Sequence, residues 1–200
     1  MKILIADEDR DFLSTYQRLL QVHSYEVVTA FDGTQVIQAL GNGTKYDLLI
    51  LSRSLPRIPA QALLETAQDR QIPVVMLLRE RVRSDWLTDS HPANAYIGFP
   101  FFPDELTGLI GEVVEKSQSQ EQLEYDGVQI DIGRFLLCGK LRVTNEEINI
   151  IRTLKDGQSL SAKRAEPYIH SLNHKLEQLG LPARIRYMIR KGYRMVTSDE

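Results

Sequence analysis

The sequence is short of cysteine and of long apolar runs. Its one cysteine, Cys138, excludes an internal disulfide and a metal site built from several cysteines. The apolar run at residues 3–6 is too short for a signal peptide or a membrane span. We therefore expect a cytosolic (cytoplasmic) protein that has no membrane partner.

The chain also lacks a large excess of charge of either sign, since its formal net charge is −3. The distribution is uneven, however: residues 1–120 hold 11 basic and 16 acidic side chains, whereas residues 121–200 hold 13 and 11. Between residues 161 and 197, eight basic side chains accompany only two acidic ones. This basic C-terminal part favours a nucleic-acid partner. A solvated basic face would give the same pattern.

The first 116 residues alternate short apolar runs with segments of helical periodicity. The apolar runs lie at residues 2–6, 26–30, 48–51, 74–78 and 95–97. Between the runs, apolar residues recur at the spacing that places them on one face of a helix. This alternation predicts an α/β fold with five parallel strands and five helices, the fourth of them at residues 81–90.

A polar stretch without periodicity, KSQSQEQ at residues 116–122, divides the chain. We place one domain at residues 1–117, a linker at 118–122 and a second domain at 123–200. In the second domain, Thr144 and Glu147 have the spacing of a capping box and predict the start of a helix. A second helix is expected over 166–179. Strands are expected at 128–132, 135–137, 141–143, 184–188 and 193–196.

The first domain resembles the receiver domain of response regulators over nearly its whole length. The matching pieces are ILIADED at 3–9, YDLLIL at 46–51, LP at 55–56, IPVVML at 72–77 and FPFFPDEL at 99–106. The resemblance implies a flavodoxin-like (βα)5 fold. It also places Tyr96 at the family's aromatic switch position and implies a cis peptide bond between Phe99 and Pro100.

The departures from the receiver pattern fall on the phosphorylation pocket. Ser52 stands where the family has its phosphoryl-accepting aspartate, Leu78 replaces a serine or threonine, and Phe99 replaces a lysine. Phosphoryl transfer needs a carboxylate nucleophile, a magnesium ion and a cation for the transferred charge. Asp7 and Glu8 alone make a poor magnesium site. We therefore expect no aspartyl-phosphate cycle and no cofactor. The alternative is that a serine/threonine kinase modifies Ser52.

The acidic cluster at residues 7–9 needs a nearby cation if no metal is bound. Arg53 and Arg79 both follow strands that end at the same edge of the expected sheet. We expect one of them to supply that charge. Without a phosphoryl signal, Tyr96 is expected to be a fixed core or interface side chain.

The second domain resembles the winged-helix effector domain of the OmpR/PhoB type. The matching pieces are VTNEEINII at 143–151, IHSLNHKL at 169–176 and IRYMIRKGYRM at 185–195. After Ser161 the chain lacks room for the family's middle helix, which predicts a shortened, α+β winged-helix-like domain. Ser171 and Asn173 replace the two arginines of the family's recognition helix.

These matches give a set of candidate DNA contacts. The recognition-like helix contributes His170, Ser171, His174 and Lys175, and the wing contributes Arg184, Arg186, Arg190, Lys191 and Arg194. Lys163 and Arg164 would add phosphate contacts. The spacing of His170 and His174 is compatible with zinc, but no third ligand is near in sequence, so we expect no metal.

Two functions are compatible with these features. The first is a phosphorylation-independent transcriptional regulator that binds double-stranded DNA and uses its receiver-like half to form a homodimer. The second is an adaptor whose shortened winged helix binds another regulatory protein, through an apolar groove that the missing helix would leave beside Leu172 and Leu176. An enzyme is not expected, because the sequence has no nucleophile–base pair, glycine-rich phosphate loop or metal triad.

Overall fold

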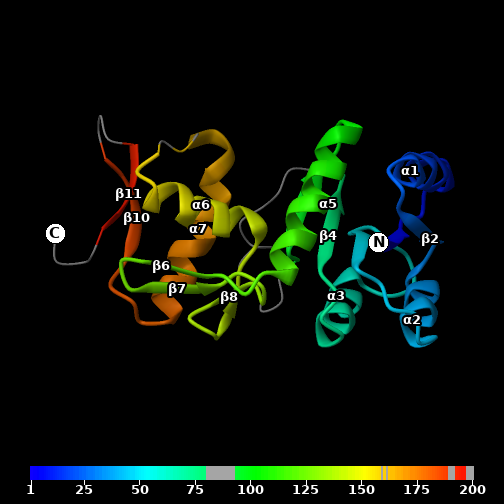
Figure 1. Ribbon diagram of the computed structural model, residues 1–200, viewed down its shortest axis with the longest axis horizontal. Helices are drawn as coiled ribbons and strands as arrows, with labels where there is room; N and C mark the ends of the chain where they lie inside the picture. The colour runs from blue at the N-terminus through cyan, green and yellow to red at the C-terminus, as the bar shows by residue number, and fades with distance from the viewer. Residues whose placement is uncertain (80–92, 159, 161, 189–191, 197–200) are drawn as a thin grey trace. The chain divides into compact units, whose positions relative to one another are not determined.

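The computed structural model describes residues 1–79, 93–158, 160, 162–188 and 192–196 (Figure 1). The helix expected at 81–90 and the wing residues Arg190 and Lys191 lie outside these residues, as do the side chains of Lys163 and Arg164. The described residues form two compact units, the first holding 1–79 and 93–115 and the second the described residues from 116 onward.

The first unit is built on a five-stranded parallel sheet. Its strands are ordered β2-β1-β3-β4-β5 and have the bounds Lys2–Ala6 (β1), Glu26–Ala30 (β2), Leu48–Ser52 (β3), Val74–Leu78 (β4) and Ala95–Gly98 (β5). Strands β3 and β4 are buried along their whole length, because helices cover both faces of such a sheet. The predicted parallel α/β fold is confirmed.

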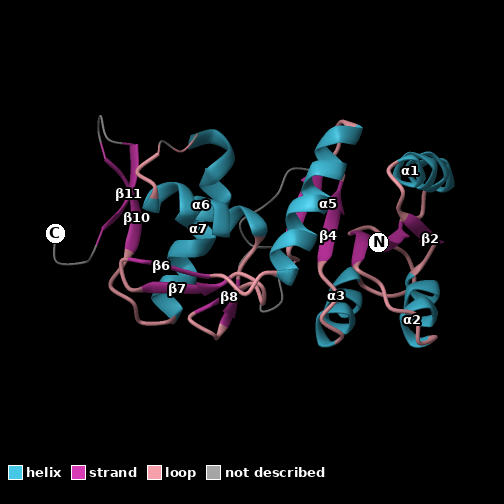
Figure 2. Ribbon diagram, viewed as in Figure 1, coloured by secondary structure: helices cyan, strands magenta, loops and turns pink. Residues whose placement is uncertain are grey.

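Four described helices accompany this sheet: α1 (Arg10–Val22), α2 (Gly33–Gly41), α3 (Ala60–Asp69) and α5 (Pro103–Gln118). Helix α2 packs against α3, and Figure 2 shows this pair on one side of the sheet and α1 on the other. Asp9 caps α1, since its side chain accepts hydrogen bonds from the backbone N–H groups of Asp11 and Phe12. The peptide bond between Phe99 and Pro100 is cis, as predicted.

The parallel sheet gathers the candidate site at one edge. Ser52 is the last residue of β3 and Leu78 is the last residue of β4. Asp7, Arg79 and Phe99 directly follow β1, β4 and β5. All four strands run in the same direction, so their carboxyl ends meet there. Ligand sites of open α/β sheets lie at this edge.

The described residues of the second unit form two sheets and two helices. An antiparallel sheet of β6 (Gln122–Tyr125), β7 (Val128–Asp131), β8 (Leu136–Leu137) and β9 (Leu141–Arg142) precedes α6 (Asn145–Lys155) and α7 (Ala162–Gln178). A separate hairpin pairs β10 (Arg184–Met188) with β11 (Gly192–Val196). Among the described helices of the chain, none is both long and apolar enough to span a membrane.

Strand β6 was not expected, because its residues are mostly polar and border the predicted linker. It forms by pairing with β7 across Asp126 and Gly127, whose φ angles are 47° and 75°. Two successive residues with positive φ are typical of the tight Asp-Gly turn that joins antiparallel strands. Only residues 119–121 therefore separate α5 from β6.

Helix α6 begins with the predicted capping box. The Thr144 hydroxyl accepts a hydrogen bond from the Glu147 backbone N–H at 3.2 Å, and Glu147 Oε2 accepts one from the Thr144 backbone N–H at 2.7 Å. Helix α6 packs against α7. Leu172 and Leu176 are fully buried, so the apolar groove expected beside them is not open. That expectation was wrong because the fold covers these two side chains without a middle helix.

Candidate functional sites at the sheet edge and the C-terminal hairpin

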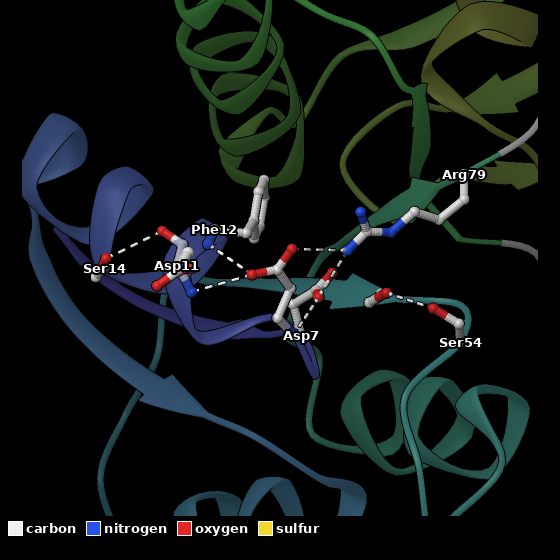
Figure 3. Close-up of polar contacts among 8 residues, drawn as sticks. Asp7, Asp11, Phe12, Ser14, Ser54 and Arg79 are labelled. Atoms are coloured by element: carbon white, nitrogen blue, oxygen red, sulfur yellow. Dashed lines mark hydrogen bonds and ion pairs between the residues drawn. The ribbon is translucent and has the colours of Figure 1, made fainter.

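An arginine occupies the acidic edge of the parallel sheet. Asp7 is fully buried, and its Oδ1 atom accepts hydrogen bonds from Arg79 Nη2 at 3.0 Å and from the Asp9 backbone N–H at 2.8 Å (Figure 3). The same Arg79 nitrogen lies 3.9 Å from Asp9 Oδ2. The prediction that Arg53 or Arg79 supplies a cation to this cluster is confirmed for Arg79. The second carboxylate oxygen of Asp7, Oδ2, is buried and has no hydrogen-bond partner among the residues that the structure describes.

One aromatic ring, that of Phe99, lies beside this ion pair and packs against two others. The Arg79 guanidinium carbon lies 5.0 Å from the centre of the Phe99 ring, within range of a cation–π interaction. The Phe99 ring lies 5.3 Å from that of Phe12 and 4.5 Å from that of Phe101. The Asp7 carboxylate is fully buried, whereas the Arg79 side chain is 45% exposed, so solvent screens the pair from the arginine side. Phe99 therefore stands beside a cation and supplies none.

The other predicted pocket residues differ in their exposure. Ser52 is buried, and its hydroxyl lies 3.2 Å from that of Ser54. Leu78 is fully buried, whereas Glu8 is exposed. Among the described residues, no three His, Cys, Asp or Glu side chains are grouped so that they could hold a metal ion.

Tyr96, at the switch position, is part of the core. It is 7% exposed, and its hydroxyl oxygen accepts a hydrogen bond from the Ala93 backbone N–H at 3.0 Å. This contact holds the ring inside the first unit. The structure thus agrees with the expectation of a fixed core side chain.

Helix α7 does not present all of the predicted DNA contacts to solvent. Ser171 is fully buried, and Lys175 is 3% exposed. Lys175 Nζ donates hydrogen bonds of 2.8 Å to both carboxylate oxygens of Glu147, which is itself fully buried. The prediction that Ser171 and Lys175 contact DNA was therefore wrong, because this face of α7 packs inside the unit. His170 and His174 are exposed.

Asn173 has a structural role that the sequence comparison did not suggest. Its side-chain nitrogen Nδ2 donates a hydrogen bond to the Ile185 carbonyl oxygen at 2.9 Å, and its Oδ1 accepts one from the Ile185 backbone N–H at 2.7 Å. This pair of bonds fixes strand β10 against α7. His174 is held locally as well, since its Nε2 atom lies 2.9 Å from Gln178 Nε2.

The described wing residues place three arginines on one face of the hairpin. Arg186 is paired directly with Arg194, and Arg184 lies two residues before Arg186 on the same strand. Side chains alternate between the two faces of a strand, so the three share a face. We call Arg184, Arg186 and Arg194 the arginine face. On the opposite face Ile185 pairs with Met195, and both side chains are buried.

Comparison with solved structures identifies the fold class. A CheY-like response regulator receiver domain protein from Methanospirillum hungatei matches 57% of this chain and 93% of its own, with 25% identity and a TM-score of 0.53. A mutant of the protein RitR matches 98% of this chain and 99% of its own, with 20% identity and a TM-score of 0.65. The first unit has the fold of a response-regulator receiver domain, and the full chain shares the fold of RitR.

Curated relatives point to transcriptional regulators. No family model matches the sequence. The transcriptional regulatory protein CpxR of Klebsiella pneumoniae is 30% identical over 145 residues, covering 66% of this chain and 62% of the relative. The transcriptional regulatory protein PrrA of Mycobacterium leprae is 23% identical over 176 residues, covering 82% and 75%. The chain is thus related to response regulators that regulate transcription, and it spans about three fifths of the length of CpxR.

Proposed function

We propose that the chain is a phosphorylation-independent transcriptional regulator that binds double-stranded DNA. In this proposal the receiver-like unit is a constitutive dimerisation module, and the second unit is a shortened winged helix of the OmpR/PhoB type. The observation that carries the proposal is the ion pair between Arg79 and the buried Asp7 carboxylate, at the edge of the sheet where Ser52 replaces the acceptor aspartate.

The chemistry of the pocket supports independence from phosphorylation. A serine hydroxyl offers no carboxylate to attack a phosphoryl donor, and the buried Ser52 is a poor substrate for a protein kinase. A divalent cation at Asp7 would have to displace the Arg79 guanidinium or lie within its repulsive field. Leu78 and Phe99 give the transferred group neither a hydrogen bond nor a fixed cation.

The second unit supports DNA as the partner. Its hairpin carries the arginine face, and the sequence adds Arg190 and Lys191 between the two strands. Only residues 156–161 separate α6 from α7. This interval is too short for a helix of ordinary length, which favours a shortened head. His170 and His174, exposed on α7, complete the candidate interface.

The experiment compares the full chain with and without acetyl phosphate and Mg²⁺. We expect no phosphoryl incorporation by intact mass spectrometry, a dimer by sedimentation in both conditions and an unchanged mobility shift with duplex DNA. A receiver protein that retains its aspartate serves as the positive control for the phosphate donor. Phosphoryl incorporation accompanied by a change in affinity would contradict the proposal.

The alternative function, an adaptor that binds a regulatory protein, is favoured by one feature of the hairpin. Tyr187 and Met188 are 63% and 38% exposed, and aromatic and methionine side chains are enriched at protein interfaces. Chromatin immunoprecipitation separates the two functions, because a regulator enriches DNA directly. An adaptor would instead co-purify with a protein partner and enrich no DNA once that partner is removed.

A further inference from the structure

The helix that would read base pairs offers little with which to read them. Base edges are recognised mainly by arginine, lysine, asparagine and glutamine side chains. On α7, however, Lys175 is paired with Glu147 inside the unit, and both polar atoms of the Asn173 amide are bound to the Ile185 backbone. Ser171 is fully buried. Of the predicted contacts on α7 whose side chains the structure describes, only His170 and His174 are exposed.

The exposed charges among the described side chains of α7 are also unfavourable for contact with DNA. Among its side chains that the structure describes, Glu166 and Glu177 are the exposed charged ones. A carboxylate brought near the phosphate backbone is repelled by it. The described surface of α7 is therefore poorly suited to lie in the major groove.

The hairpin has the opposite character. Arg186 and Arg194 stand directly opposite each other, and like charges at such positions of an antiparallel pair repel. Neither forms an ion pair with any residue that the structure describes, and strands β10 and β11 contain no acidic residue. A pair of unneutralised cations on one face is explained if an external polyanion supplies the countercharge.

We infer that the arginine face binds the phosphate backbone of duplex DNA while α7 reads no base sequence, so that the chain binds duplexes with little sequence preference. This inference rests on the proposed function and restricts it. Phosphate contacts position a protein on the duplex without carrying sequence information. The consequence is a regulator whose affinity depends on salt far more than on sequence.

The expected magnitudes follow from counterion release. Each phosphate contact contributes about −0.9 to the slope of log affinity against log salt, so three arginines give about −2.7 for each protomer. This slope corresponds to a loss of affinity of about 40-fold between ~50 and ~200 mM salt. Replacing two of the arginines should make the slope shallower by about 2. Proteins that read bases prefer their site at least about a thousandfold over other DNA, whereas we expect less than about tenfold.

The test measures fluorescence anisotropy of the full chain on two short duplexes of unrelated sequence and on duplexes selected from a random pool, over a salt series. The Arg186→Ala/Arg194→Ala variant removes the repelling pair. The matched control, Lys140→Ala/Lys155→Ala, removes the same charge from exposed positions of the second unit. A His170→Ala/His174→Ala variant tests readout by α7. Circular dichroism verifies that every variant is folded.

We expect the arginine variant alone to lose salt-dependent affinity, and the histidine variant to bind both duplexes like the parent chain. A selected sequence bound a thousandfold more tightly, with that preference lost in the histidine variant, would overturn the inference and leave the proposed function intact. Tighter binding to the single strands than to the duplexes would also overturn the inference. Absence of binding to every duplex at low salt would refute the proposed function itself.

Discussion

Replacing Lys175 tests whether α7 is a surface for DNA or part of the core. Lys175 lies at a position where the winged-helix resemblance predicts a DNA contact. In the structure its ammonium group instead donates to both oxygens of Glu147, with the two side chains 4% and 0% exposed. The variant Lys175→Met keeps the length and the apolar stem of the side chain and removes only the charge.

The magnitude follows from what the substitution leaves behind. Glu147 would remain buried with its Oε2 atom bound to the Thr144 backbone N–H and with no opposite charge beside it. Removing one partner of a buried ion pair destabilises a protein by about 3–5 kcal/mol. The exposed Lys155→Met, in the last turn of α6, should change stability by less than about 0.5 kcal/mol. The double variant Lys175→Met/Glu147→Gln should recover part of the loss, because the buried charge is gone.

Amide hydrogen exchange of α6 and α7 measures this effect within the second unit, independently of the stability of the first. We expect protection in both helices to fall strongly for Lys175→Met and to stay at the parent level for Lys155→Met. DNA affinity per folded molecule should be unchanged. If Lys175→Met kept full protection and lost DNA binding, Lys175 would be a surface contact and the reasoning would be refuted.

Three further predictions concern buried or partly buried side chains. Burial raises the pKa of Glu146 from 4.5 to about 7, so the folded state binds a proton more tightly than the unfolded state, and stability falls as pH rises between these values. Glu146→Gln should remove this fall, so the free energy of unfolding of the variant, relative to that of the parent, should increase by up to ~3 kcal/mol between pH 4 and pH 8. If urea unfolding gave the same difference between variant and parent at both pH values, the prediction would be contradicted. Arg79→Met should destabilise the first unit by about 1–3 kcal/mol in urea unfolding, because Asp7 loses its countercharge, and an unchanged midpoint would show that the pair contributes nothing. The variant Ser52→Asp should still take up no phosphoryl group from acetyl phosphate, as measured by mass spectrometry, because Arg79 and Phe99 remain in place. Uptake would show that the pocket lacks nothing but the acceptor aspartate.

The sheet of the first unit could be predicted from sequence because its signal is local. Strands β3 and β4 are continuous apolar runs, as expected of parallel strands that are buried on both faces. Strand β6 carries no such signal, because only Leu123 is buried in it. The neighbouring Asp126-Gly127 turn was the available clue, since a tight hairpin turn requires a strand on each side.

The position of Lys175 could also have been read from periodicity. Leu172 and Leu176 lie on the apolar face of α7, and Lys175 follows Leu172 by three residues, a spacing that places the two side chains next to each other on the helix surface. The resemblance to the winged-helix recognition helix instead indicated a surface position for Lys175. Its partner, Glu147, was harder to predict from sequence, because a capping-box glutamate is ordinarily exposed at the start of a helix. Nothing local indicated that the second oxygen of Glu147 would face a lysine 28 residues later.

Pairing with a buried carboxylate separates the structural cations of this chain from those that are available to bind a ligand. Arg79 and Lys175 each donate to a carboxylate that is buried, so their charges are neutralised within the fold. Lys175 could bind a phosphate only by leaving Glu147 buried without its countercharge, which costs several kcal/mol. Arg186 and Arg194 carry no such cost, because they face each other and have no acidic partner among the described residues. Binding a phosphate there relieves repulsion, so the hairpin is where a polyanion gains most.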